Sequence, residues 1–214
     1  MQPYPGPLAS SPLPAIQYEK PTFRASDLYD LYYEHFHPAH PIALPRASLS
    51  EASKEKDLTQ LHAVLRYIGS VFSSTHSTPS LLEAAGHVLI SQTPPKDGFT
   101  VQAFLLFAIA LHSQADQDRA LQVLDAAIDM ALEIGLNRQE FARLHGEGRQ
   151  CLEESWRRTW WELYVIDGMF AAIHQKETFR LLKVQCDVAL PCEELDYITN
   201  KVSASLAYGW KTLS

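Results

Sequence analysis

Apolar side chains recur every three or four residues in six stretches of this 214-residue chain, and proline- or glycine-containing breaks separate the stretches. This spacing gathers the apolar residues on one side of an α-helix, whereas a half-buried strand alternates every second residue. The stretches cover roughly residues 27–37, 57–72, 78–91, 100–113, 116–134 and 151–173. No convincing alternating stretch competes with them. The sequence therefore predicts an all-α fold, an irregular multi-helix bundle of about six helices.

Residues that suit helix ends mark several of these boundaries. Ser26 and Thr100 stand where a side-chain oxygen could cap a first turn, and Thr78 is followed by proline at the first helical position. Gly135 follows the fifth stretch, where a left-handed residue commonly ends a helix. The stretch 101–113 is apolar nearly all round. We therefore expect it to be buried on all sides.

Composition divides the chain into three parts. Residues 1–24 hold six prolines with scattered serine and glycine, which predicts an extended arm or linker rather than a packed element. Residues 25–192 carry the helical signal and form the predicted domain. Residues 193–214 are expected to be a truncated C-terminal segment, too short to close a domain alone.

Charge and cysteine content limit the classes of function. The 25 acidic residues outnumber the 18 Lys and Arg, giving a net charge of −7 that repels phosphate backbones. The three cysteines, Cys151, Cys186 and Cys192, form no C-x-x-C pair and no disulfide framework, which is typical of a reducing compartment. The longest apolar run, residues 103–111, is about half the length of a membrane span. We expect a soluble intracellular protein without a membrane contact.

Several motifs, taken in order, resemble the fungal-specific transcription factor domain, the middle homology region of zinc-cluster fungal transcription factors. The motifs are Leu31-Tyr-Tyr-Glu-His-Phe-His-Pro38, Thr100-Val-Gln-Ala-Phe-Leu-Leu-Phe107, Ala126-Ala-Ile-Asp-Met-Ala-Leu-Glu-Ile-Gly-Leu-Asn137, Glu154-Ser-Trp-Arg-Arg-Thr-Trp-Trp-Glu-Leu-Tyr-Val-Ile-Asp167 and Cys186-Asp-Val-Ala-Leu-Pro191. The Arg-Arg-x-Trp-Trp…Asp helix is the most specific of them. The resemblance covers about residues 27–192.

The resemblance implies a regulatory domain of a nuclear transcription factor. It implies contacts with other transcription regulators or with a second copy, and a small hydrophobic effector as a further possibility. Family members bind DNA through an N-terminal binuclear zinc cluster of six cysteines, and this chain has no cysteine before residue 151. We therefore expect no zinc or other cofactor in this chain, and only an indirect link to DNA. As a truncated member, it could compete with full-length relatives for partners.

The charged part of the most specific motif invites two interpretations. Arg157 and Arg158 follow Glu153 and Glu154 by four residues each, which is the favourable order for ion pairs on a helix surface. A paired role on the surface or at a domain interface is favoured over binding of a phosphate or another anion.

The aromatic part of the motif is equally ambiguous. Trp156, Trp160, Trp161 and Tyr164 could line an effector pocket, but an aromatic row at helical spacing is more often core, and we favour core packing. Trp161 lies one position off the row and could face a neighbouring helix or a partner. Asp167 lies on the apolar side and needs a tyrosine, backbone or arginine hydrogen bond to compensate its burial.

No set of residues in the sequence predicts a metal site or a catalytic site. His35, His37 and His40 do not share a helix face, so a metal site is not expected there. No nucleophile elbow, phosphate-binding glycine loop, dinucleotide fingerprint or H-E-x-x-H motif occurs. We predict that the protein is not an enzyme. Two alternatives stay open: a helical-repeat interaction scaffold, although no period near 34 residues is present, and an all-helical enzyme with a dispersed site.

Overall fold

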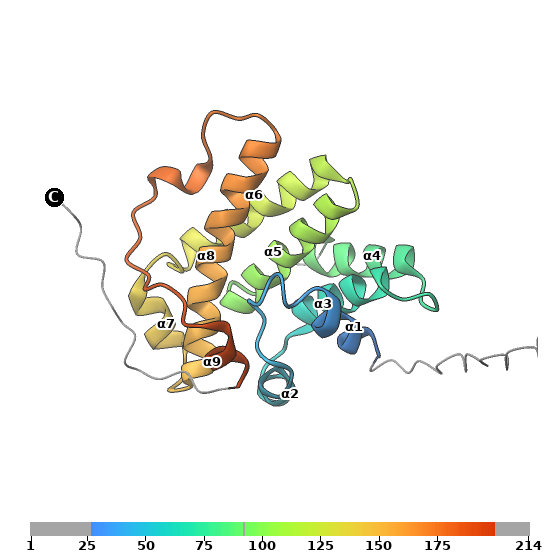
Figure 1. The fold of residues 1–214 in the computed structure, drawn as a ribbon, viewed down its shortest axis with the longest axis horizontal. Helices are drawn as coiled ribbons and strands as arrows, with labels where there is room; N and C mark the ends of the chain where they lie inside the picture. Colours follow the sequence, from blue (N-terminus) through green and yellow to red (C-terminus); the bar gives the residue numbers. More distant parts are fainter. Residues whose placement is uncertain (1–26, 92, 200–214) are drawn as a thin grey trace, which may run out of the picture.

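The computed structural model describes residues 27–91 and 93–199, and within these ranges it contains helices and no strand (Figure 1). The all-α prediction is confirmed. The helices are α1 Asp27–His35, α2 Arg46–Glu55, α3 Thr59–Val71, α4 Thr78–Gly86, α5 Gly98–Ser113, α6 Gln117–Glu133, α7 Gln139–His145, α8 Gln150–Ile173 and α9 Glu194–Ile198. A π-helical turn, His87–Ser91, continues α4, and a 3-10 turn, Arg180–Lys183, follows α8. None of the helices within these ranges is long and apolar enough to cross a membrane.

Six of these helices match the predicted stretches, and α2, α7 and α9 were missed. The three missed helices have 10, 7 and 5 residues, and they carry few apolar side chains. Helix α2, for example, buries only Leu49 and Ala52, so it carries no apolar face long enough to produce a periodic signal.

The N-terminal helices pack closely, and one glycine permits the approach. Helix α1 crosses α3 at Gly69, where a Cβ atom built on the glycine would lie 1.9 Å from the carbonyl oxygen of Leu28. No side chain fits that space, so the two backbones are in direct contact. Helix α4 then packs on α3 (Figure 1).

The centre of the bundle is the hairpin of α5 and α6. Every residue of α5 from Gly98 to Leu111 is buried, which confirms the expectation for this stretch. The cap of α5 is Asp97 rather than Thr100: the Asp97 carboxylate accepts a hydrogen bond from the Thr100 N–H at 2.8 Å, and the Thr100 side chain is buried. Gly135 ends α6 with a φ of +76°, as predicted.

Helix α8 packs on α5, α6 and α7, and the chain then runs back along it (Figure 1). We call residues 174–193, which connect α8 to α9, the return segment. Asn137 Nδ2 donates to the Gln185 carbonyl at 3.0 Å, and Asp187 Oδ1 accepts from the Gln139 N–H at 2.8 Å. These two bonds hold the Asp-Val-Ala-Leu-Pro motif against the start of α7.

The predicted division into three parts is only partly covered by the described residues. The arm at residues 1–24 and the Ser26 cap lie outside them, as does the C-terminal segment from residue 200 onward. Tyr197 of α9 lies beyond the predicted boundary at residue 192, yet it is fully buried in the same core as α8. The described part of α9 therefore packs with the helical domain.

Candidate functional site

Helix α8 carries all six residues singled out by the sequence. It begins after Gly148, whose φ is +71°, and continues for 24 residues without a break. The six residues do not converge on one site. Arg158 lies in its first half beside Tyr197 of α9, and Arg157 pairs with Glu153 and Glu154 of α8 itself. Asp167 lies nearly three turns further on, beside the 3-10 turn.

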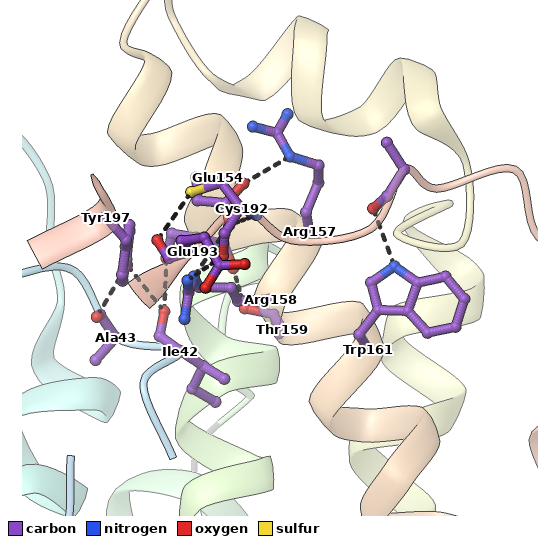
Figure 2. Close-up of polar contacts among 12 residues, drawn as sticks. Ile42, Ala43, Glu154, Arg157, Arg158, Thr159, Trp161, Cys192, Glu193 and Tyr197 are labelled. Atoms are coloured by element: carbon purple, nitrogen blue, oxygen red, sulfur yellow. Dashed lines mark hydrogen bonds and ion pairs between the residues drawn. The ribbon is translucent and has the colours of Figure 1, made fainter. Parts of the chain in front are cut away.

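A buried carboxylate organises the first half of α8 (Figure 2). Glu154 has no exposed surface, and it accepts hydrogen bonds from Arg157 Nε at 2.8 Å, Arg158 Nε at 3.0 Å and the Cys192 N–H at 2.8 Å. Three donors satisfy the charge that burial would otherwise penalise heavily.

The pairing of Glu154 with Arg158 was predicted on the surface or at a domain interface, and the pair instead lies buried between segments of the domain. The pair forms at the predicted spacing, but only 8% of Arg158 is exposed, because the end of the return segment and α9 cover it. The second predicted pair, Glu153 with Arg157, is long at 3.8 Å, and Arg157 bonds Glu154 instead. Helical spacing reveals which side chains are neighbours along α8, but not what packs on top of them.

Arg158 joins three segments of the chain. Its Nη2 donates to the Cys192 carbonyl at 2.8 Å, and its Cζ lies 4.5 Å from the centre of the Tyr197 ring, a cation–π contact. The Tyr197 hydroxyl donates to the Ala43 carbonyl at 3.0 Å, in the loop after α1. Complete burial raises the pKa of Tyr197 well above its usual value, so the phenol stays neutral. Arg158 and Tyr197 therefore fasten α9 between α8 and the α1–α2 loop (Figure 2).

A buried polar cluster that the sequence did not suggest lies beneath this contact. Gln102 Nε2 of α5 lies 3.0 Å from the Ile42 carbonyl, 2.8 Å from Ser155 Oγ and 2.9 Å from Thr159 Oγ1. Ser155 Oγ also donates to Ile42 at 2.7 Å. The one signal that could have revealed the cluster is Gln102 itself, a polar residue inside an otherwise apolar stretch. A glutamine in such a position needs polar partners on the next element.

The aromatic residues of α8 pack against protein. Trp160 is fully buried, and the Trp156 indole N–H donates to the His145 carbonyl at 3.0 Å. Trp161 is half-buried and donates to the Ala189 carbonyl at 3.0 Å, which ties the return segment to α8 (Figure 2). Tyr164 meets Phe179 edge to face, with ring centres 5.2 Å apart.

Asp167 lies on the buried side of α8, and its Oδ2 accepts a hydrogen bond from the Leu181 N–H at 2.8 Å. A backbone group was one of the three alternative partners predicted for this carboxylate. Burial raises the pKa of Asp167 above its ordinary value, and the bond from Leu181 and the nearby Arg180 counteract part of the rise. Arg180 in turn pairs with Asp125 at 2.9 Å and Asp129 at 2.5 Å on α6. These contacts hold the 3-10 turn on α6 and α8.

A small pocket lies beside Asp167. Its volume is about 70 Å³, whereas sites for drug-sized ligands occupy roughly 300 Å³ or more. The lining residues are Leu121, Leu124, Asp125, Asp167, Phe170, Ala171, Lys176, Thr178, Phe179 and Arg180. None of the four tryptophan and tyrosine residues proposed for an effector pocket belongs to it.

The cysteines and histidines do not fit the zinc cluster of the family. A binuclear cluster needs six cysteines, and this chain has three, of which Cys151 is buried in α8, Cys186 is exposed and Cys192 is half-buried. Within residues 27–91 and 93–199, no three His, Cys, Asp or Glu side chains group as metal ligands. His37 Nε2 contacts the Ala43 carbonyl at 3.1 Å and His40 Nδ1 contacts Glu162 at 2.6 Å.

Comparisons with known proteins agree with the motifs. The family model described as "Fungal specific transcription factor domain" matches residues 29–205. The C6 finger domain transcription factor iacK of Pestalotiopsis fici is 39% identical over 178 residues, which cover 83% of this chain. The same match spans 27% of that relative, so the chain corresponds to about a quarter of its length. No solved structure matches the chain. The resemblance seen in the sequence is confirmed, and the chain belongs to the fungal specific transcription factor domain family.

Proposed function

We propose that this chain is a regulatory domain that controls transcription from the nucleus, through contacts with other transcription regulators or with a second copy. The observation that carries the proposal is the family match, which spans residues 29–205, together with the resemblance to a C6 finger transcription factor. The family is one of transcription factor domains and not a known enzyme family. The net charge of −7 favours an indirect link to DNA, through an associated DNA-binding module.

The contacts of α8 support a scaffold role for its motif. The charges of Glu154 and Arg158 are directed inward and are satisfied by neighbouring segments. A buried ion pair of this kind orients the elements that it joins, and it leaves the outer surface of the domain available for partners. Trp156 and Trp160 are packed against protein, and the pocket beside Asp167 is small. We therefore favour macromolecular partners over a small hydrophobic effector.

A reporter experiment tests the proposal. The full chain is fused to an unrelated DNA-binding domain and expressed in a fungal cell with a matching reporter, beside the DNA-binding domain alone. We expect the fusion to change reporter output several-fold, and a fluorescent fusion to accumulate in the nucleus.

Two variants show whether the effect needs the folded domain. Arg158→Ala removes a buried arginine and should abolish the effect, whereas Arg143→Ala removes an exposed arginine of α7 and should preserve it. Equal reporter output from the fusion and from the DNA-binding domain alone would contradict the proposed function.

A further inference from the structure

The ends of helices α5 and α8 bring two histidine rings together. His112 lies in the last turn of α5, and His174 directly follows the last residue of α8. Their ring centres lie 5.6 Å apart, with an angle of 87° between the ring planes. The Nε2 atom of each ring is buried, and neither atom has a hydrogen-bond partner among the described residues. Buried polar atoms are nearly always bonded to a partner, so two such atoms on neighbouring rings need an explanation.

Both rings are held in position by Phe170 of α8. The His112 ring stacks on the Phe170 ring, with 4.1 Å between the ring centres. His174 follows Phe170 by four residues and its backbone N–H donates to the Phe170 carbonyl at 3.0 Å, so it lies on the same face of α8. Both histidines are half-buried rather than fully enclosed, so a small ion can reach the pair from solvent.

The surroundings of the pair favour neutral rings and a bound cation. Burial and the nearby His174 hold the pKa of His112 below its ordinary value, so near neutral pH this ring keeps a lone pair on one nitrogen. Helix α5 ends at Ser113 and α8 ends at Ile173. The negative ends of two helix dipoles therefore lie beside the two rings, and each of them stabilises a positive charge.

We propose that His112 and His174 together bind one Zn²⁺ ion through their Nε2 atoms. Neutral imidazole is a common ligand of Zn²⁺, at a Zn–N distance of about 2.0–2.1 Å. Two imidazoles that share a tetrahedral ion therefore have ring centres roughly 5–5.5 Å apart, close to the 5.6 Å of this pair. No third ligand side chain groups with them in residues 27–91 and 93–199, so the remaining coordination positions are open to water.

This site differs from the zinc cluster of the family, which is built from cysteines. The prediction of no cofactor could not take the pair into account, because His112 and His174 lie 62 positions apart and no motif joins them. An ion held between them links the end of α5 to the end of α8. The site does not depend on the proposed role in transcription, since it rests only on contacts within the helical domain.

Zinc titration of the full, metal-free chain tests the proposal. NMR spectra of the imidazole nitrogens follow each histidine while ZnCl₂ is added, and His112→Gln and His174→Gln assign the two signals. We expect the Nε2 signals of His112 and His174 to shift together, and the signal of His87, an exposed histidine of the π-helical turn, to stay in place.

The variants measure how much each ring contributes. Loss of a residue that only orients a metal ligand costs about 10–100-fold in affinity, so loss of a ligand should weaken Zn²⁺ binding at the remaining histidine at least about tenfold. His87→Gln is the matched control and should bind as the wild type does. Zn²⁺ should also raise the melting temperature of the wild type, and this rise should disappear in His112→Phe, which keeps a ring on Phe170.

Three results overturn the proposal. The first is a shift of only one of the two Nε2 signals in the wild-type chain, which folds by definition. The second is equal Zn²⁺ affinity of the wild type and the two glutamine variants. The third is Zn²⁺ binding that Cys186→Ser abolishes while the signals of His112 and His174 stay in place, which assigns the ion to the exposed thiol.

Discussion

The guanidinium of Arg158 lies on the ring of Tyr197, 39 positions later in the chain, with 4.5 Å between Cζ and the ring centre. Nε of the same arginine donates a hydrogen bond to the buried Glu154 carboxylate. One side chain thus links α8 to α9 by a charged hydrogen bond on one side and by an aromatic contact on the other. The stability of the domain should depend strongly on it.

Arg158→Ala tests that dependence. The substitution removes one of the two arginines that pair with the buried Glu154 carboxylate and also removes the support of Tyr197, so we expect a loss of about 3–5 kcal/mol in the free energy of unfolding. Urea denaturation measures the loss. Arg143→Ala, which removes an exposed pair with Glu140 at 3.2 Å, should cost no more than about 1 kcal/mol. Similar costs for the two variants would show that the buried pair of Glu154 and Arg158 contributes no more to stability than an exposed pair.

Tyr197 tests whether α9 belongs to the folded domain. Tyr197→Phe keeps the ring on Arg158 and loses the hydroxyl bond to the Ala43 carbonyl, so it should cost about 1 kcal/mol. Tyr197→Ala also removes a fully buried ring and should cost about 3–5 kcal/mol. Both values come from urea denaturation. A cost near zero for the alanine variant would mean that the domain ends before α9.

Gln102→Leu should disturb the polar cluster between α5 and α8. Leucine cannot donate to the Ile42 carbonyl or to Thr159 Oγ1, so buried acceptors lose a partner, and we expect a cost of about 1–3 kcal/mol. Gln122→Leu on the exposed side of α6 is the matched control and should change stability by less than about 0.5 kcal/mol. Thermal and urea unfolding of both variants compare the two sites directly.

Two glycines in helix interiors should respond in opposite directions to alanine. Gly69→Ala places a Cβ against the Leu28 backbone, 1.9 Å from its oxygen, so α1 and α3 must separate and the variant should lose about 2 kcal/mol or more. Gly168→Ala meets only the Phe179 ring at 3.6 Å, an ordinary contact, and should gain about 0.5–1 kcal/mol from helix propensity. Equal effects in urea denaturation would contradict the close crossing of α1 and α3.

The contribution of Asp167 to the free energy of unfolding should decrease as the pH rises. Burial places its folded-state pKa above its ordinary value of 3.8, so folding takes up a proton between these two pKa values. A group that binds its proton more tightly in the folded state stabilises the fold fully below its unfolded pKa and loses that contribution as pH rises through the folded one. The unfolding free energy of the wild type minus that of Asp167→Asn should therefore fall from about pH 3.8 upward and then level off. A difference that rises with pH would contradict the prediction.

The sequence predicted the helices whose apolar residues recur every three or four positions, because burial of one face imposes that period. It did not predict α2, α7 or α9, since their few apolar residues do not establish a period. The predicted cap of α5 was wrong for a different reason. Thr100 and Asp97 both have a cap-forming side chain, and only the position of the first turn distinguishes them.

The sequence predicted which side chains of α8 are neighbours on the helix, but not which other segments of the chain pack on them. The pairing of Glu154 with Arg158 follows from their spacing of four residues, and so does the place of Trp160 in the core. The burial of that pair depends on Cys192 and Tyr197, which lie more than 30 positions away. Contacts between such distant segments leave no local pattern, and they decided whether a charged pair faced water or the core.

The bond from Tyr197 to the Ala43 carbonyl joins residues 154 positions apart. At a synthesis rate of about 5–20 residues per second, some 8–30 s pass between the emergence of the two partners from the peptidyl transferase centre. During that interval the loop after α1 lacks its final cover, and the charged face of α8 lacks it from the time when that face has been made. The nascent chain should therefore depend on chaperones until α9 has been made.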